Sequence, residues 1–140
     1  MKKKDAFEKS LELANKSEIA MVGSNGDDGY PNIKAMLKMK NEGLKKIWFS
    51  TNTSSKRVAQ FKKDPKACVY FVDMLKFKGV MLVGEMDIHQ DIKSRKLFWK
   101  EGFERYFPLG INDPDYCVLC FTAKRGNYYH KFENTTFQIE

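Results

Sequence analysis

The chain has 140 residues, the size of one ordinary domain, and 42% of them are hydrophobic, which predicts a packed globular protein and excludes a disordered one. Its three cysteines are too few for a disulfide framework, and no apolar run is long enough for a bilayer span or a signal-peptide core. We therefore expect a single cytoplasmic domain over residues 1–140 with no membrane contact.

The net charge of +7 is concentrated in one part of the chain. Residues 34–66 hold ten Lys or Arg and two acidic residues, a balance of +8, whereas the rest holds fifteen basic and sixteen acidic residues, a balance of −1. Clustering of this kind predicts an anionic partner, and a phosphorylated cofactor, a nucleic acid or an acidic surface would each satisfy it.

Hydrophobic periodicity in the first part of the chain predicts an amphipathic helix over residues 3–16 and strands over 18–24, 31–40 and 45–50. The second of these strands alternates with period two. One of its faces carries Ile33, Ala35, Leu37 and Met39. We expect this face to enter the core and the opposite face to carry cations.

A short helix over 54–65 comes next. Thr53 or Ser54 can cap it, and Asp64-Pro65 ends it. The remaining elements are strands over 66–72 and 79–90, a helix within 91–103 that starts near Asp91 and buries Leu97, Phe98 and Trp99, and strands over 116–125 and 127–132.

The fold class that these elements predict is mainly β. Six to seven antiparallel strands with hairpin-length turns indicate a small β-barrel with peripheral helices, because closure removes exposed strand edges. Gly84 is a candidate bulge or barrel corner. A split α+β sandwich is the alternative.

Metal, redox and hydrolase chemistry find little support. Cys117 and Cys120 lie in an apolar strand pattern, where residues three apart point to opposite faces, so we expect buried structural thiols and no metal site. His89 and His130 have no nucleophile motif beside them, and there is no phosphate-binding glycine loop.

The basic segment contains a candidate anion site at the start of its helix. A helix N-terminus offers unpaired N–H groups, and here Lys56 and Arg57 follow the hydroxyls of Ser50, Thr51, Thr53, Ser54 and Ser55. Lys34 on the neighbouring strand could complete it. The alternatives are a solubilising basic face with a Ser/Thr cap, and a nucleic-acid surface. Against the latter, Trp48 and Phe49 alternate, so only one of them faces outward.

The order "PNIKAMLKMKNEGLKKIWFSTNTSSKRVAQFKKDPKACVYFV" resembles the pyridoxamine 5'-phosphate oxidase-like flavoproteins, which have an FMN-binding split β-barrel. The later "SRKLFWKEGFERYFPLGINDPDYCVLCFTAKRGNYYHKF" is similar to their general-stress-protein branch. The resemblance covers the chain from about residue 5.

This resemblance implies an FMN site and a role for each matching residue. Lys34 stands at the phosphate-binding position of the family, and Lys56 and Arg57 match its basic pair, assisted by Ser55. Ser50 and Thr51 match the pair that touches the flavin or its ribityl chain. The remaining implied residues are Ala35, Met36 and Leu37, on the strand facing the ring, and Tyr129 near the closing strand. Family members are generally homodimers with FMN at the subunit interface.

Two cofactor positions depart from the family pattern. Met39 and Gly79 stand near positions where the oxidase itself has a Lys and a Gln, and Lys38 or Lys40 are candidate substitutes for the Lys. The oxidase's C-terminal substrate residues are absent, so vitamin B6 oxidation is not expected. The resemblance implies an FMN-dependent oxidoreductase for a small substrate, with NAD(P)H as a candidate donor and Tyr128, Tyr129 and His130 as residues to test. The alternatives are a non-catalytic flavin-binding stress protein and a nucleic-acid-binding barrel.

Overall fold

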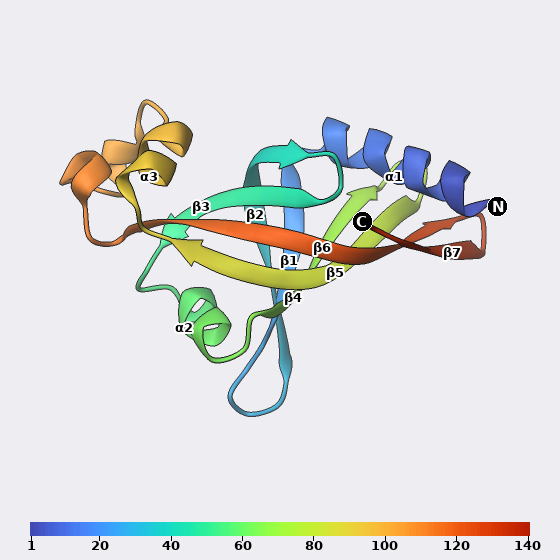
Figure 1. Cartoon of the computed structure of the whole chain (residues 1–140), viewed down its shortest axis with the longest axis horizontal. Coiled ribbons are helices and arrows are strands. Elements are labelled where there is room, and N and C mark those ends of the chain that lie inside the picture. Colours follow the sequence, from blue (N-terminus) through green and yellow to red (C-terminus); the bar gives the residue numbers. More distant parts are fainter.

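The computed structural model describes all residues from Met1 to Glu140. Its helices are α1 (Lys3–Lys16), α2 (Lys56–Lys63) and α3 (Ile92–Phe98), with two short 3₁₀ helices, η1 (Phe103–Arg105) and η2 (Gly110–Asn112) (Figure 1). The strands are β1 (Ile19–Asn25), β2 (Pro31–Glu42), β3 (Lys46–Asn52), β4 (Lys66–Asp73), β5 (Lys78–His89), β6 (Tyr116–His130) and β7 (Glu133–Gln138). No helix is long and apolar enough to cross a membrane.

The seven strands form one antiparallel sheet that closes on itself. Their order is β3-β2-β1-β4-β5-β6-β7, and β3 also pairs with β6 along its whole length. Six strands therefore make a closed barrel, and β7 extends the sheet beside β6. The expected antiparallel barrel with peripheral helices is confirmed.

Gly84 marks a bend in the barrel wall, as expected. The β5–β6 register shifts between Val83 and Gly84. A Cβ atom added to Gly84 would lie 2.0 Å from the carbonyl oxygen of Thr122, so only glycine allows the two strands to approach this closely.

The main core fills the barrel and continues beneath α1. This helix buries Ala6, Leu13 and Ala14 on one stripe, the pattern of an amphipathic helix. Figure 1 shows α1 near β7 and the C-terminus, with α3 at the opposite end of the long strands.

The expected core face of β2 is wrong. Ile33 and Leu37 are 72% and 46% exposed, whereas Met36 is only 8% exposed and joins the core. Lys38 shares the inward side with Met36, and its ammonium donates a hydrogen bond to the carbonyl of Ala14 at the end of α1 (2.6 Å). Both faces of β2 contain apolar residues, so alternation alone could not identify the buried one, and the long Lys38 side chain can reach a polar partner.

The second and third predicted helices are present as α2 and α3, with different caps or buried residues. The cap of α2 is Ser55, whose hydroxyl accepts a hydrogen bond from the Val58 N–H (3.3 Å), and not Thr53 or Ser54. Asp91 caps α3 as expected. In α3, Phe98 is buried and stacks on Trp48, but Leu97 is 65% exposed.

The C-terminal strands differ from the expectation. The predicted strands over 116–125 and 127–132 are one continuous strand, β6, and β7 was not predicted. Gly126 does not interrupt β6, because the ring of Phe137 on β7 packs over it: a Cβ atom at Gly126 would lie 2.6 Å from that ring. Cys117 and Cys120 are free and buried on opposite faces of β6, as expected, with Cys117 in the main core.

Candidate functional site

A cavity of about 440 Å³ lies where β2 and β3 separate. β2 pairs with β3 only from Lys38 onward, so residues 31–37 pair with β1 alone and leave one backbone edge unpaired. The start of α2 and the connection after α3 line the other sides. This volume lies within the range of small-molecule sites.

Most of the predicted cofactor residues meet in this cavity. Its lining includes Lys34, Ala35, Met36, Leu37, Ser50, Thr51 and Arg57. Ser55 and Lys56 adjoin it at the start of α2 but do not line it. Sequence segments some twenty residues apart are therefore brought together by the β2–β3 hairpin and the turn into α2.

The basic end of the cavity is the N-terminus of α2. The backbone N–H groups of Lys56 and Arg57 have no hydrogen-bond partner, because only the Val58 N–H is capped. Lys34 faces this end from β2. The cavity is thus lined by two cationic side chains, and the helix that carries Arg57 begins beside it with free amides, features that suit a phosphate group.

Two cavity residues carry buried polar atoms without a partner. Of the four such side-chain atoms in the chain, Ser50 Oγ and Arg57 Nε belong to this lining. The Tyr116 hydroxyl donates to the carbonyl of Arg95 (3.1 Å) and interacts with the Ser50 side chain, although no hydrogen bond of good geometry reaches Ser50 Oγ. Burial also lowers the pKa of the Arg57 guanidinium from its ordinary value. Buried polar groups normally have partners, so a ligand atom or a water molecule is expected beside each of these two atoms.

The hydroxyl-rich turn before α2 is satisfied internally. Asp115 accepts hydrogen bonds from Thr53 Oγ1 (2.9 Å), from the Ser54 N–H (2.9 Å) and from Ser54 Oγ (3.2 Å). Ser55 caps α2. Of the five hydroxyls in this stretch, only those of Ser50 and Thr51 line the cavity.

Part of the cavity lining is aromatic, and this part was not predicted from the sequence. Phe103, Tyr106 and Phe107 come from η1 and the turn after it. Behind them, Trp99 and Tyr116 form edge-on and tilted contacts with Phe103 and Phe107. The only sequence signal was a group of aromatic residues in a turn-rich connection, so the cavity lining has a cationic part and an aromatic part.

Besides Ser55 and Lys56, three more candidate cofactor residues lie outside the cavity. Tyr129 is at the far end of β6 from Tyr116, where it pairs with Gly79 and contacts Phe77. Lys38 points toward the Ala14 carbonyl, and Lys40 lies over Trp48 and pairs with Glu42 (3.5 Å). Neither lysine lines the cavity.

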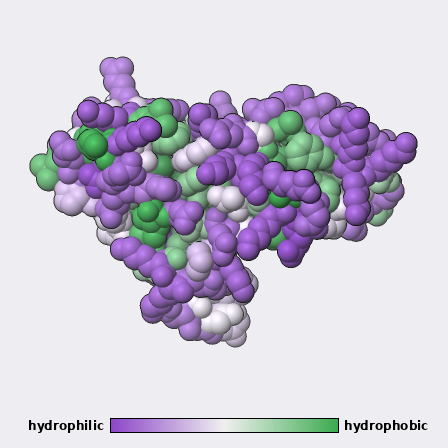
Figure 2. All heavy atoms as spheres, viewed as in Figure 1, coloured by the Kyte–Doolittle hydropathy of each residue, from purple (hydrophilic) through white to green (hydrophobic).

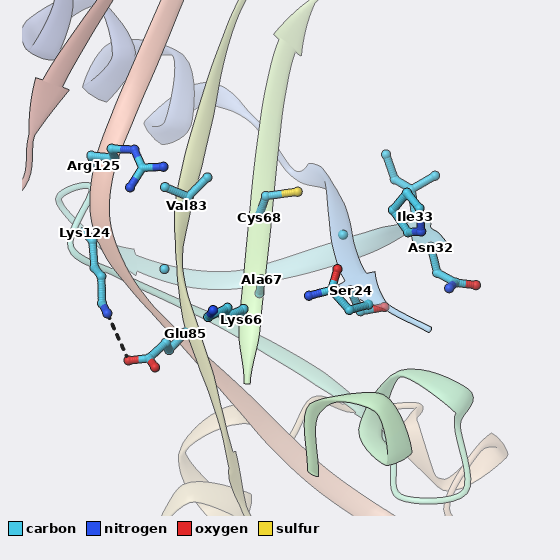
Figure 3. Close-up of a pocket in the computed structure, with 14 residues that line it drawn as sticks. Ser24, Asn32, Ile33, Lys66, Ala67, Cys68, Val83, Glu85, Lys124 and Arg125 are labelled. Carbon is cyan, nitrogen blue, oxygen red and sulfur yellow. Dashed lines mark ion pairs between the residues drawn. The ribbon is translucent and has the colours of Figure 1, made fainter. Parts of the chain in front are cut away.

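A second, larger hollow of about 690 Å³ lies on the outer face of β1, β4, β5 and β6 (Figure 3). Figure 3 shows Lys66, Cys68 and Arg125 around it, while Lys124 pairs with Glu85 (3.5 Å). No residue of its lining has a buried unpaired polar atom, and no helix N-terminus faces it. The cavity beside α2 is therefore the better candidate for a functional site.

The family model "Pyridoxamine 5'-phosphate oxidase like" matches residues 5–139. No curated protein sequence matches the chain. A protein from Clostridium acetobutylicum related to general stress protein 26 of B. subtilis (pyridoxinephosphate oxidase family) is 53% identical, with a TM-score of 0.86 over 99% of this chain and 97% of that one.

Two more distant structures share the fold. General stress protein 26 from Bacillus anthracis has 17% identity and a TM-score of 0.78, over 95% of this chain and 98% of that one. A heme binding protein from Mycobacterium smegmatis has 14% identity and a TM-score of 0.77, over 95% of this chain and 57% of that one. The match across nearly the whole sequence shows that the chain belongs to the pyridoxamine 5'-phosphate oxidase-like family.

Proposed function

We propose that the chain binds FMN in the cavity between β2, β3 and α2, and that it is an FMN-dependent oxidoreductase acting on a small substrate. The observation that carries the proposal is the pair of buried unpaired atoms, Ser50 Oγ and Arg57 Nε, in a cavity that also contains free helix amides. A phosphorylated ligand with a polar chain supplies acceptors for both.

The two parts of the cavity lining suit the two ends of FMN. Arg57, Lys34 and the amides at the start of α2 would hold the phosphate, and Ser50 and Thr51 the ribityl chain. The unpaired backbone edge of 35–37 and the aromatic wall would hold the ring. Bound FMN supplies the electron transfer, while the protein fixes its position and excludes water.

We further propose that the protein is a homodimer. The outer face of β1, β2, β4 and β5 exposes Ile19, Met21, Ile33, Leu37, Val72 and Met81, by 37% to 72%. The strand registers place Ile19 opposite Leu37, and Met21 opposite Tyr70, which in turn lies opposite Met81.

The size of this apolar face fits a second copy of the chain. A standard interface takes about 800 Å² from each partner, of which roughly 65% is apolar in homodimers. The six side chains expose on the order of 500 Å², close to that apolar share. By contrast, the lower projection in Figure 2, which corresponds to α2 and the β1–β2 hairpin in Figure 1, is mostly hydrophilic.

A two-fold pairing across this face would also explain how Tyr129 could contact the cofactor although it lies outside the cavity of its own chain. The cavity adjoins the face at Leu37 on β2, and Tyr129 lies beyond its other side on β6. Because a two-fold axis exchanges opposite sides of a self-complementary face, it would bring the Tyr129 end of one copy toward the cavity of the other.

Titration of the purified protein with FMN and riboflavin tests the cofactor assignment. We expect FMN fluorescence to be quenched at one FMN per chain, with riboflavin binding at least tenfold more weakly because it lacks the phosphate. A protein that takes up no FMN contradicts the proposal. NAD(P)H oxidation by the loaded protein then separates an oxidoreductase from a non-catalytic flavin-binding stress protein.

Parallel titrations with hemin and with a labelled oligonucleotide test the other candidates. The cavity lining contains neither histidine nor cysteine, so only Met36, Met39 or Tyr106 could ligate a heme iron there, which gives heme less support. Trp48 stacks on Phe98 and is not free for base stacking, which gives nucleic acid less support. Tight hemin or oligonucleotide binding without FMN binding would favour those functions instead.

Light scattering tests the dimer. We expect the mass of two chains for the wild type and of one chain for Met21→Glu, which places a charge in the centre of the apolar face. Leu97→Glu is the matched control, because Leu97 is 65% exposed on α3, outside that face. A wild-type monomer, or an unchanged dimer in Met21→Glu, contradicts this assignment.

A further inference from the structure

Asp115 lines the candidate cavity, and its carboxylate is held by donors of the turn before α2 that are not themselves part of the lining. Three donors converge on it: the Ser54 N–H, Ser54 Oγ and Thr53 Oγ1, at 2.9 to 3.2 Å. Backbone amides and hydroxyls in a turn are the same donors that proteins use for phosphate oxygens. Asp115 also lines the cavity that contains Lys34 and Arg57.

The backbone fixes this carboxylate independently of its own hydrogen bonds. The Thr53 N–H donates to the Asp115 carbonyl (2.7 Å), and the Asp115 N–H donates to Asp113 Oδ1 (3.0 Å). The Ser54 N–H and the Thr53 hydroxyl hold the pKa of the Asp115 carboxyl below its ordinary value, so the group carries its negative charge at neutral pH.

Asp115 does not pair with the cations of the site. No ion pair joins it to Lys34, Lys56 or Arg57, and Arg57 Nε is unpaired. The site therefore has two anion positions of different kinds. The one at the start of α2 is free, and the one formed by residues 53 and 54 is filled by the protein's own carboxylate.

We propose that Asp115 is a specificity-determining residue that restricts this site to ligands with a single phosphate group. It takes the donors that a second phosphate would need, and its charge repels one. The inference rests on the proposed function, because it assumes that the free position receives the phosphate of FMN. It excludes FAD and other diphosphates by charge.

The test compares mono- and diphosphates in the wild type and in Asp115→Ala. FMN and FAD affinities are measured by fluorescence titration, and thermal shifts are measured with inorganic phosphate and with pyrophosphate. We expect the ratio of FAD to FMN affinity to rise at least tenfold in Asp115→Ala, and pyrophosphate to stabilise the variant more than the wild type.

Asp91→Ala is the matched control. Asp91 also accepts from a serine N–H and hydroxyl, those of Ser94, but it does not line the cavity. We expect this variant to lower stability without changing the FAD to FMN ratio.

If Asp115 only ties the turn together, FMN and FAD affinities fall in parallel in Asp115→Ala, and this result overturns the inference. An unchanged ratio overturns it as well. The thermal shifts give a result that does not depend on flavin binding: equal pyrophosphate stabilisation of wild type and variant overturns the inference, whereas absent FMN uptake by the wild type overturns the proposed function.

Discussion

Replacement of Arg57 by Ala should weaken FMN binding far more than replacement of Lys56 by Ala. The two residues are adjacent at the start of α2, and the sequence gives them equal standing as a basic pair. The structure separates them: Arg57 lines the cavity and has a buried unpaired Nε, whereas Lys56 is exposed and outside it.

The magnitudes follow from these environments. A hydrogen bond to a charged group contributes about 1.5 to 3 kcal/mol, so Arg57→Ala should weaken FMN binding about tenfold to 150-fold. An exposed charge contributes less than about 1 kcal/mol, so Lys56→Ala should cost less than about fivefold. Arg57→Ala removes no hydrogen bond of the ligand-free protein, so its unfolding midpoint in urea should not fall.

Fluorescence titration of FMN and riboflavin with both variants provides the measurement. The loss in Arg57→Ala should appear for FMN and be small for riboflavin, because only FMN carries the phosphate. Arg57→Lys should lie between wild type and Arg57→Ala, since an ammonium keeps the charge without the planar fork. Equal losses for the Lys56 and Arg57 variants, or an equal loss for riboflavin, would refute the assignment of Arg57.

Three further predictions concern the fold. Gly84→Ala should lower the free energy of unfolding by at least about 2 kcal/mol in urea denaturation, because the new Cβ atom would lie 2.0 Å from the Thr122 carbonyl oxygen. An unchanged urea midpoint contradicts the close approach of β5 and β6. Burial raises the pKa of Cys117 to about 11 and also raises the pKa of Cys120. Mass spectrometry should therefore find both thiols unalkylated by iodoacetamide at pH 8 in the native protein and alkylated in urea. Alkylation of either thiol in the native protein contradicts their burial. Hydrogen bonds lower the carboxyl pKa values of Asp64, Asp73, Asp91 and Asp115 in the folded protein. Their contribution to stability is therefore present above the pKa of the unfolded chain, about 3.9, and is lost as the pH falls through the lower folded pKa values. A urea midpoint at pH 3 equal to that at pH 6 contradicts this.

The barrel was predictable because its signals are local. The apolar runs of β4 and β5 and the turn residues between strands specify hairpins, and hairpins favour an antiparallel sheet. The buried side of β2 was not predictable, because it depends on whether Lys38 can reach a polar partner in α1. Likewise, Gly126 looked like a strand break until Phe137, from a strand that was not expected, was found over it.

The cationic end of the site was also predictable, since Lys34, Ser50 and Arg57 belong to one segment of the chain. The aromatic wall and Asp115 come from more than forty residues later. Their role depends on the pairing of β3 with β6, which places Asn52 opposite Tyr116 and so brings the turn before α2 against Asp115. Turn chemistry explained Asp115 in the sequence, but only this long-range pairing reveals which donors it takes.

A crystal structure of the protein soaked with FMN tests the central claim most directly. The account predicts electron density for the phosphate at the N-terminus of α2, within hydrogen-bond distance of the Arg57 side chain and with Lys34 beside it. Density for the flavin in the hollow around Cys68 and Arg125, or at any place that leaves Ser50 Oγ and Arg57 Nε unpaired, would contradict it.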